Sequence, residues 1–163
     1  MTTPDVRPVD GEADLLHWRY VHNLVVPPCA LTLAEVRERA RRNHLEIALL
    51  DGEPIGCSTV RPPAPATARD AAAATVIARV LPAHRGRGLG AHLYERGLRH
   101  ALALGARTVE TFVLEAAADG LRFAARRGFT EVERYPLTSA PDARTEVHLR
   151  LAAPGDGSAG GGA

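Results

Sequence analysis

The sequence contains no lysine, and its 20 basic residues, all arginine, are balanced by 19 acidic residues to a formal net charge of +1. A chain with so little net charge has no general attraction for nucleic acid or for an anionic membrane, so any basic site must be local. Cysteine is also scarce, because only Cys29 and Cys57 are present. Two cysteines so far apart exclude a metal knuckle or a disulfide framework, and we expect both to be reduced and to serve as small apolar side chains.

Long hydrophobic runs are missing as well. No stretch approaches the roughly 20 apolar residues that a membrane-spanning helix needs, and Met1–Pro8 lacks the charged start and apolar core of a signal peptide. The histidines are scattered without the spacing of metal ligands. We therefore expect a cytoplasmic protein with no membrane partner and no metal.

The composition that remains is typical of one globular domain. The 163 residues are 45% hydrophobic and 24% charged, which is enough to bury one substantial core but short for two domains. We expect this domain to span residues 1–153. Residues 154–163 are rich in glycine and have no large apolar side chain, so we expect a disordered tail there.

Hydrophobic periodicity and turn residues predict a mixture of strands and helices. Residues 61–74, rich in proline and alanine, are expected to form a mobile surface loop or a poorly ordered strand extension. Thr32 and Asp119 are the expected N-caps of the second and fourth helices. The expected strands cover residues 6–9, 45–50, 55–60, 75–81, 108–114, 131–137 and 145–151, and the expected helices cover residues 12–24, 31–43, 89–102 and 119–127.

A glycine-rich segment, Arg85-Gly86-Arg87-Gly88-Leu89-Gly90, lies between the strand 75–81 and the long helix that follows. A helix N-terminus presents unpaired N–H groups and a partial positive charge, and glycine lets a phosphate come close to them. The segment has neither the Walker lysine nor the glycine spacing of the dinucleotide fingerprint. It predicts a site for another phosphate-bearing ligand, and the alternative is a tight turn with solvated arginines.

This segment resembles the pyrophosphate loop of the GCN5-related N-acetyltransferases (GNAT), whose pattern is Gln/Arg-x-x-Gly-x-Gly/Ala. The strand 76–82 and the later Gly128-Phe129 are also similar to that family, and the resemblance covers residues 6–151. It implies an α+β fold in which about four helices flank a mixed, mostly antiparallel sheet of about six to seven strands. It also implies acetyl-CoA as acyl donor, bound by Ala78, Arg79, Val80, Arg85, Gly86, Arg87, Gly88, Leu89 and Gly90.

Acyl transfer to an amine requires a group that removes the amine's proton, because an alkylamine has a pKa of about 10.4. Glu115, at the end of the strand 108–114, is our first candidate, while Glu110 needs a partner and fits a structural role better. In the family, an Asn and a Tyr that donates a proton to the departing thiolate often occupy the positions that correspond to Ala117 and Ala124 here. The reaction must then use water, another tyrosine or no acid at all, and Tyr135 is the candidate tyrosine.

Other aromatic and polar residues have weaker assignments. We expect Trp18 and Tyr94 to pack in the core, whereas His22 and Asn23 could contact substrate.

The sequence thus predicts an acyl-CoA-dependent N-acyltransferase, by default an acetyltransferase, that acts as a monomer or homodimer on a primary amine of a small molecule or peptide. One alternative is a catalytically silent acyl-CoA-binding regulatory module, because the usual Asn and Tyr are absent. A second is a nucleic-acid-binding domain that uses Arg37–Arg42 and Arg126-Arg127. These arginines lack the interleaved aromatic residues of a base-stacking surface, so we expect no nucleic-acid partner.

Overall fold

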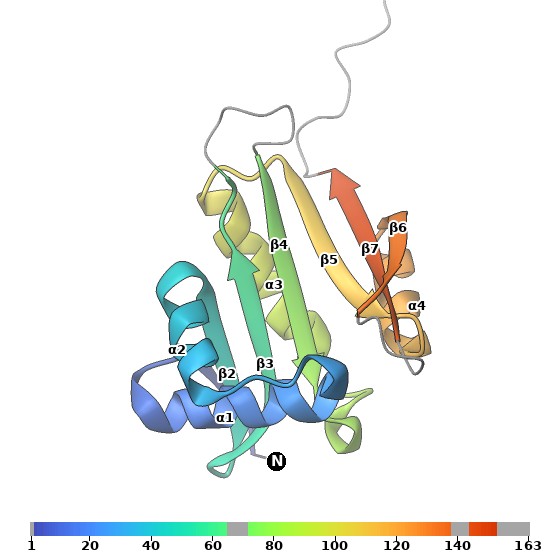
Figure 1. Ribbon diagram of the computed structural model, residues 1–163. Helices are drawn as coiled ribbons and strands as arrows, with labels where there is room; N and C mark the ends of the chain where they lie inside the picture. Colours follow the sequence, from blue (N-terminus) through green and yellow to red (C-terminus); the bar gives the residue numbers. More distant parts are fainter. Residues whose placement is uncertain (1, 65–71, 138–143, 153–163) are drawn as a thin grey trace, which may run out of the picture.

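The computed structural model describes residues 2–64, 72–137 and 144–152. In these ranges the chain forms seven strands and four α-helices (Figure 1). The strands are β1 (Asp5–Pro8), β2 (His44–Leu50), β3 (Glu53–Arg61), β4 (Ala73–Val80), β5 (Thr108–Leu114), β6 (Thr130–Pro136) and β7 (Thr145–Ala152). The helices are α1 (Gly11–Val25), α2 (Leu33–Arg42), α3 (Leu89–Ala103) and α4 (Ala118–Arg126), with 3-10 turns η1 (Pro27–Cys29) and η2 (Pro82–His84). The expected tail and residues 65–71 of the expected loop lie outside the described residues.

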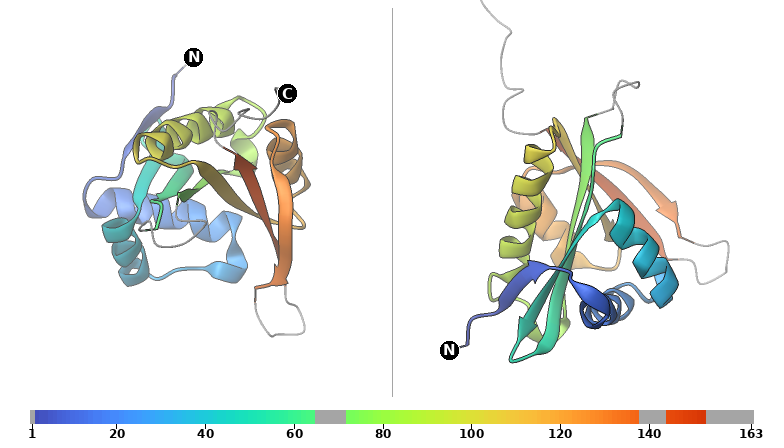
Figure 2. Two further views of the ribbon diagram at one scale, coloured as in Figure 1. Left: turned by 90° about the horizontal axis from the view of Figure 1, so that it is seen from above. Right: turned by 90° about the vertical axis from the view of Figure 1, so that its left-hand side faces the viewer.

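The strands form one sheet in the order β1-β2-β3-β4-β5-β7-β6. Neighbouring strands are antiparallel except β4 and β5, which run parallel. Figure 2 shows α3 on one side of the sheet and α1 and α2 on the other. The mixed, mostly antiparallel α+β architecture predicted from the sequence is therefore confirmed.

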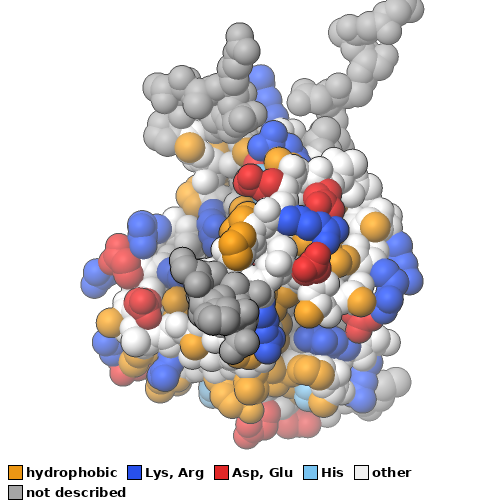
Figure 3. All heavy atoms as spheres, turned by 45° about the vertical axis from the view of Figure 1, so that its right-hand side comes forward, with side chains coloured by type: hydrophobic (Ala, Val, Ile, Leu, Met, Phe, Trp, Pro, Cys, Tyr) orange, Lys and Arg blue, Asp and Glu red, His pale blue; other side chains and the backbone are white. Residues whose placement is uncertain are grey.

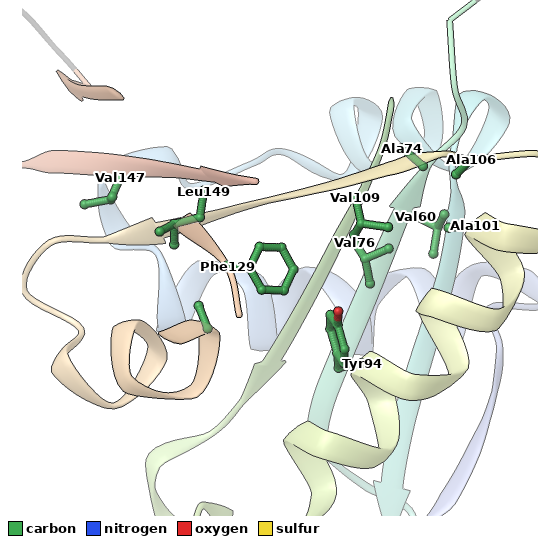
Figure 4. Close-up of a cluster of buried hydrophobic side chains, with 11 residues drawn as sticks. Val60, Ala74, Val76, Tyr94, Ala101, Ala106, Val109, Phe129, Val147 and Leu149 are labelled. Atoms are coloured by element: carbon green, nitrogen blue, oxygen red, sulfur yellow. The ribbon is translucent and has the colours of Figure 1, made fainter. Parts of the chain in front are cut away.

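Two hydrophobic layers hold the helices to the sheet. On the α1 and α2 face, Trp18 is fully buried, and its indole N–H donates to the Ser58 carbonyl at 3.0 Å, which confirms its expected core role. On the other face, Tyr94 of α3 packs edge-on against Phe123 and Phe129, and Figure 4 shows Tyr94 with Phe129. Tyr94 is thus a packing residue, as the sequence predicts.

The N-termini of α2 and α4 agree with one of the two predicted N-caps. Thr32 and Glu35 form the expected capping box of α2. Asp119 is not the N-cap of α4, because Ala117 occupies that position and Asp119 lies in the first turn, paired with Arg122. The expectation for Asp119 was wrong, because the N-cap lies two residues earlier than this carboxylate suggested.

Candidate active site

The sheet opens between β4 and β5. These parallel strands pair only over Ala73–Thr75 and Thr108–Glu110, although β4 continues to Val80 and β5 to Leu114. Figure 1 shows the two strands diverging beyond this short pairing. On their other sides, β4 stays paired with β3 and β5 with β7. The opening therefore has two strand edges that an extended ligand could join through main-chain hydrogen bonds.

The pairing with β3 determines which main-chain groups of β4 face this opening. Leu81 N–H donates to the Ile55 carbonyl at 2.9 Å, so Leu81 and Ile55 form a hydrogen-bonded pair. Such pairs alternate along antiparallel strands, so every second residue of β4, counted back from Leu81, also has its N–H and carbonyl directed toward β3. Arg79 is one of these residues. Ala78 and Val80 lie between the pairs and turn their main-chain groups toward β5. Of the three residues expected to hold an extended ligand here, only these two have the orientation for it.

After β4, the glycine loop leads into α3. Gly86 (φ +72°) and Gly88 (φ +79°) adopt the left-handed conformation that favours glycine, and a Cβ on either would have nothing within 4 Å. Gly88 is the N-cap of α3, and its carbonyl accepts the His92 N–H at 3.0 Å. The N–H groups that precede His92 in the helix have no carbonyl within the helix to bind. An open surface with such donors and a positive helix end suits a phosphate.

The remaining loop residues have different surroundings. Arg85 turns back, and its Nε donates to the Val80 carbonyl at 2.9 Å, so its guanidinium holds the end of β4. Leu89 is buried and anchors the first turn of α3. Arg87 is exposed beside the glycines. A Cβ at Gly90 would lie 3.7 Å from Val80 Cγ2, which is ordinary contact.

One face of the opening is closed. Val80, Leu89 and Leu93 pack together beneath α3, and Val76 packs with Tyr94 further along. Figure 4 shows Val76 and Tyr94 in the space between α3 and the strands. The face toward α1 and α2 instead carries charged side chains of β3, β4, β5 and β7 beside the apolar layer under α1. We call it the reachable face, because we infer that a second reactant approaches from that side.

Glu115 directly follows β5, where the sequence placed it. Its N–H donates to the Thr145 carbonyl at 2.9 Å, and its carboxylate pairs with Arg134 of β6. Arg134 also binds Glu131 at 2.6 Å, and these hydrogen bonds, first to Glu131 and then to Glu115, raise the pKa of Arg134. The structure thus gives Glu115 a fixed cationic partner, and its role as a base stays a prediction.

Tyr135 lies opposite Glu146 in the pairing of β6 with β7, on the face toward α1 and α2. Its hydroxyl donates to Glu146 Oε2 at 2.7 Å. Burial, followed by this hydrogen bond, raises the pKa of Tyr135. The phenol therefore keeps its proton far into the alkaline range. Its role as an acid also stays a prediction.

Glu110 has the partners that the sequence required. Its carboxylate lies 2.7 Å from Arg150 and 3.2 Å from Nε2 of His148. The His148 ring in turn stacks on Phe112, with 4.7 Å between the ring centroids. These contacts join β5 to β7 and support the structural role.

The positions that carry Asn and Tyr in the family differ here. Ala117 caps α4, and Ala124 is buried against the core beneath the sheet. His22 and Asn23 serve the fold, because His22 Nε2 contacts the Cys29 carbonyl at 2.9 Å and the Asn23 amide bonds the main chain of Leu31. These contacts support structural roles, and a substrate contact of either residue stays a prediction.

Three residues that the sequence did not single out as a group lie on the reachable face. Arg61 ends β3 and stacks over Phe112, with 5.6 Å from Cζ to the ring centroid. Arg79 and Glu146 lie on the same face from β4 and β7. Strand alternation could have placed each on this side, but no local signal shows that β3, β4 and β7 bring them to one region.

The cysteines, the potential metal ligands and the helix lengths were the subject of further expectations. Cys29 and Cys57 are free, and burial raises the pKa of the Cys57 thiol to about 12. Within the described ranges, no three His, Cys, Asp or Glu side chains are grouped as metal ligands, and none of the helices is long and apolar enough to cross a membrane.

Several arginines of the nucleic-acid alternative are engaged within the fold. Arg37 pairs with Glu12, Arg41 with Glu38, and Arg127 packs over the Phe123 ring at 4.4 Å. Figure 3 shows acidic and basic side chains interspersed over the face of the molecule that it presents. This arrangement gives no support to a nucleic-acid surface.

Comparison with known proteins identifies the class of protein that this opening and loop define. The family described as the acetyltransferase (GNAT) family matches residues 13–129, so the chain belongs to the GNAT acetyltransferases. The yncA protein of Salmonella typhimurium, solved with its cofactor acetyl-CoA, superposes with a TM-score of 0.71 at 16% identity, covering 95% of this chain and 96% of its own.

Two further structures show the same fold. An N-acetyltransferase of Staphylococcus aureus Mu50 has a TM-score of 0.72 at 14% identity over 93% of this chain and 99% of its own. The ribosomal-protein-S18-alanine N-acetyltransferase of Escherichia coli has a TM-score of 0.69 at 16% identity over 96% of this chain and 99% of its own. No curated protein sequence matches this chain.

Proposed function

We propose that this protein transfers the acetyl group of acetyl-CoA to a primary amine of a small molecule or peptide. The observation that carries the proposal is the opening between β4 and β5, which leads directly into a glycine loop at the N-terminus of α3. Family membership supports it, since GNAT proteins are acetyltransferases. The amine itself is a separate question, treated below.

The residues present fit an acyl-CoA. Ala78 and Val80 offer main-chain groups to an extended amide-bearing arm, and the open glycines leave room for a pyrophosphate against the N–H groups of the loop. Bound there, acetyl-CoA would supply an acetyl thioester, whose C–S bond breaks as the C–N bond of the product amide forms. The chain's own contribution is to orient the two reactants and to manage protons.

Proton transfer is needed because the acceptor is an ammonium ion at neutral pH. One proton must leave the nitrogen before attack, and another is released as the amide forms, while the departing thiolate takes up one. We propose Glu115 as the acceptor of the first proton, directly or through water, and Tyr135 as the donor to the thiolate. The hydrogen bond from Tyr135 to Glu146 supports a protonated phenol on the face from which the amine arrives.

The silent acyl-CoA-binding module is the second candidate. Ala117 and Ala124 favour it, because they stand where the family often has an Asn and a proton-donating Tyr. A thiol is a tolerable leaving group without an acid, so this difference does not abolish transfer in principle. The two candidates differ in turnover, not in cofactor binding.

The test of the cofactor site compares two glycines with the same backbone strain. Gly88→Val should raise the Kd for acetyl-CoA at least about tenfold, because the side chain enters the space in which a phosphate meets the loop. Gly105→Val is the matched control, since Gly105 (φ +87°) also has open space around it but lies at the far end of α3. Calorimetry gives both affinities, and equal values would exclude the loop as the site.

Turnover is measured as thiol release from acetyl-CoA with a panel of primary amines. We expect release with at least one amine and none without an amine. Tight acetyl-CoA binding with no release for any amine would favour the silent module.

A further inference from the structure

The reachable face of the opening carries two arginines, Arg79 and Arg61, to which the described residues offer no carboxylate partner. Arg79 lies opposite Cys57 in the pairing of β4 with β3, and Cys57 packs against α1, so both side chains occupy the face toward α1 and α2. Arg61 lies on the same face at the end of β3 and reaches across to Phe112 of β5. In the part of the chain that the structure describes, no carboxylate comes within ion-pair distance of either guanidinium.

These two charges are held in an unfavourable setting. Burial lowers the pKa of both arginines. The charge of Arg39 lowers the pKa of Arg61 further, and the charges of Arg61 and Arg39 lower the pKa of Arg79 further. A guanidinium nevertheless remains charged at neutral pH. Partly buried like charges destabilise the fold unless an anion binds them, and the planar guanidinium is well suited to a carboxylate.

An acidic group faces the same region from the other half of the sheet. Glu146 of β7 raises the pKa of both Arg61 and Arg79, so its charge acts on them without forming a direct ion pair. Its carboxylate is held by the Tyr135 hydroxyl at 2.7 Å. Positive groups from β3 and β4 and a negative group from β7 thus lie on one face, separated by the opening.

We propose that Arg79 and Arg61 bind a carboxylate of the acceptor, so that the amine acetylated by this protein belongs to a small amino acid or a similar aminocarboxylate. The inference rests on the proposed acetyltransferase function and names its substrate class. Arg79 belongs to the strand that borders the opening, so a carboxylate on its guanidinium holds a nearby amine at that edge. The ammonium group of the amino acid then faces Glu146 and Tyr135. The positive and negative groups of the site are thus arranged to meet the carboxylate and the ammonium of a free amino acid.

The test uses pairs of L-amino acids and their primary amides, which share a side chain and differ in the carboxylate. The ratio of kcat/KM for acid over amide is measured in the wild type and in Arg79→Gln. Comparing the ratios cancels the difference in amine pKa between the two substrates. We expect the ratio to fall 10- to 100-fold in Arg79→Gln, mainly through KM for the acid, because a charge-assisted hydrogen bond is lost.

Three further variants make the result specific. Arg61→Gln should lower the ratio in the same direction, and Arg79→Lys should retain part of it because the charge remains. Arg99→Gln is the matched control, since Arg99 is exposed on α3, on the opposite side of the sheet. Thermal melting shows which variants are folded. An unchanged ratio in folded Arg79→Gln and Arg61→Gln would overturn the inference while leaving the acetyltransferase function intact.

A binding measurement keeps the two proposals distinguishable if no pair is acetylated. Calorimetry of the same acids and amides is then performed on the protein saturated with coenzyme A. Binding of acids but not amides, lost in Arg79→Gln, would support the carboxylate site even though transfer had failed. Equal binding of acids and amides, or no binding of either, would overturn it.

Discussion

His22 shows how a single buried side chain makes stability depend on pH. Its ring stacks on Trp18, with 5.1 Å between centroids, and its Nε2 contacts the Cys29 carbonyl. Burial, aided by the charge of Arg79, lowers the pKa of His22 to about 4 in the folded protein. In the unfolded chain the same group takes a proton near pH 6.5.

We predict that His22 makes the protein less stable in weak acid. Its contribution is complete above about pH 6.5 and is lost as the pH falls toward about 4, by roughly 3 kcal/mol in total, because only the unfolded chain binds the proton over that range. Urea unfolding across this range measures the change. His22→Phe should flatten the dependence, whereas His92→Ala, on the exposed side of α3, should retain it. Equal slopes in both variants would contradict the assignment.

Glu115 and Tyr135 should affect the reaction differently. Glu115→Gln is expected to lower kcat/KM about 10²-fold at neutral pH, since a general base typically contributes at least that much. Tyr135→Phe should lower kcat while the Kd for acetyl-CoA stays unchanged. Because the pKa of Tyr135 is raised, the wild type should show no loss of rate from this phenol below about pH 10. Full activity in Glu115→Gln would assign the base to another residue.

Two glycines of α3, Gly97 and Gly90, differ in the space around them. A Cβ at Gly97 would lie 2.7 Å from Val76 Cγ1, so this glycine lets α3 approach β4 closely. A Cβ at Gly90 meets only ordinary contact, and the residue lies within the helix. The close approach at Gly97 is what seals the α3 face of the opening.

We therefore predict that Gly97→Ala destabilises the protein by about 1 to 3 kcal/mol through overpacking. Gly90→Ala should instead leave stability unchanged or raise it by up to about 1 kcal/mol, because alanine favours the helix. Chemical denaturation measures both, and calorimetry with acetyl-CoA shows whether Gly90→Ala preserves the loop. Similar stability losses in the two variants would mean that helix packing does not distinguish these positions.

Individual elements could be predicted because their signals are local. The strand 108–114 was predicted with its observed bounds, and the Thr32–Glu35 pair marks the start of α2. Asp119 shows where such reasoning fails. A carboxylate near a helix start is compatible with the N-cap or the first turn, and here the packing of α4 on the sheet places it in the turn.

The candidate site could be predicted only in part, because it depends on contacts between distant strands. The glycine loop is contiguous in sequence and was found. The hydrogen bond of Tyr135 with Glu146, and the approach of Arg61 to Phe112, depend on strand order and register. The main-chain orientation of Arg79 depends on which residues of β4 form the hydrogen-bonded pairs with β3. The sequence alone does not determine this register.

The whole sheet consists of two halves, β1 to β4 and β5 to β7, that pair with each other only through three residues on each side. The α3 and α4 face adds a shared hydrophobic core across this junction. A ligand in the opening would extend the hydrogen bonding of β4 where the strands diverge. Binding should therefore leave a signature in the main chain of β4 that alternates along the strand.

We predict that acetyl-CoA slows hydrogen exchange at Ala78 and Val80 by at least about tenfold, because their N–H groups face the opening and gain acceptors from the ligand. Ile77 and Arg79 form the pairs with β3, so their N–H groups should be protected before binding and should change much less. Residue-resolved exchange measured by NMR, with and without acetyl-CoA, tests this alternation. Uniform slowing of all four residues would instead indicate global stabilisation, and no change at Ala78 or Val80 would place the ligand outside the opening.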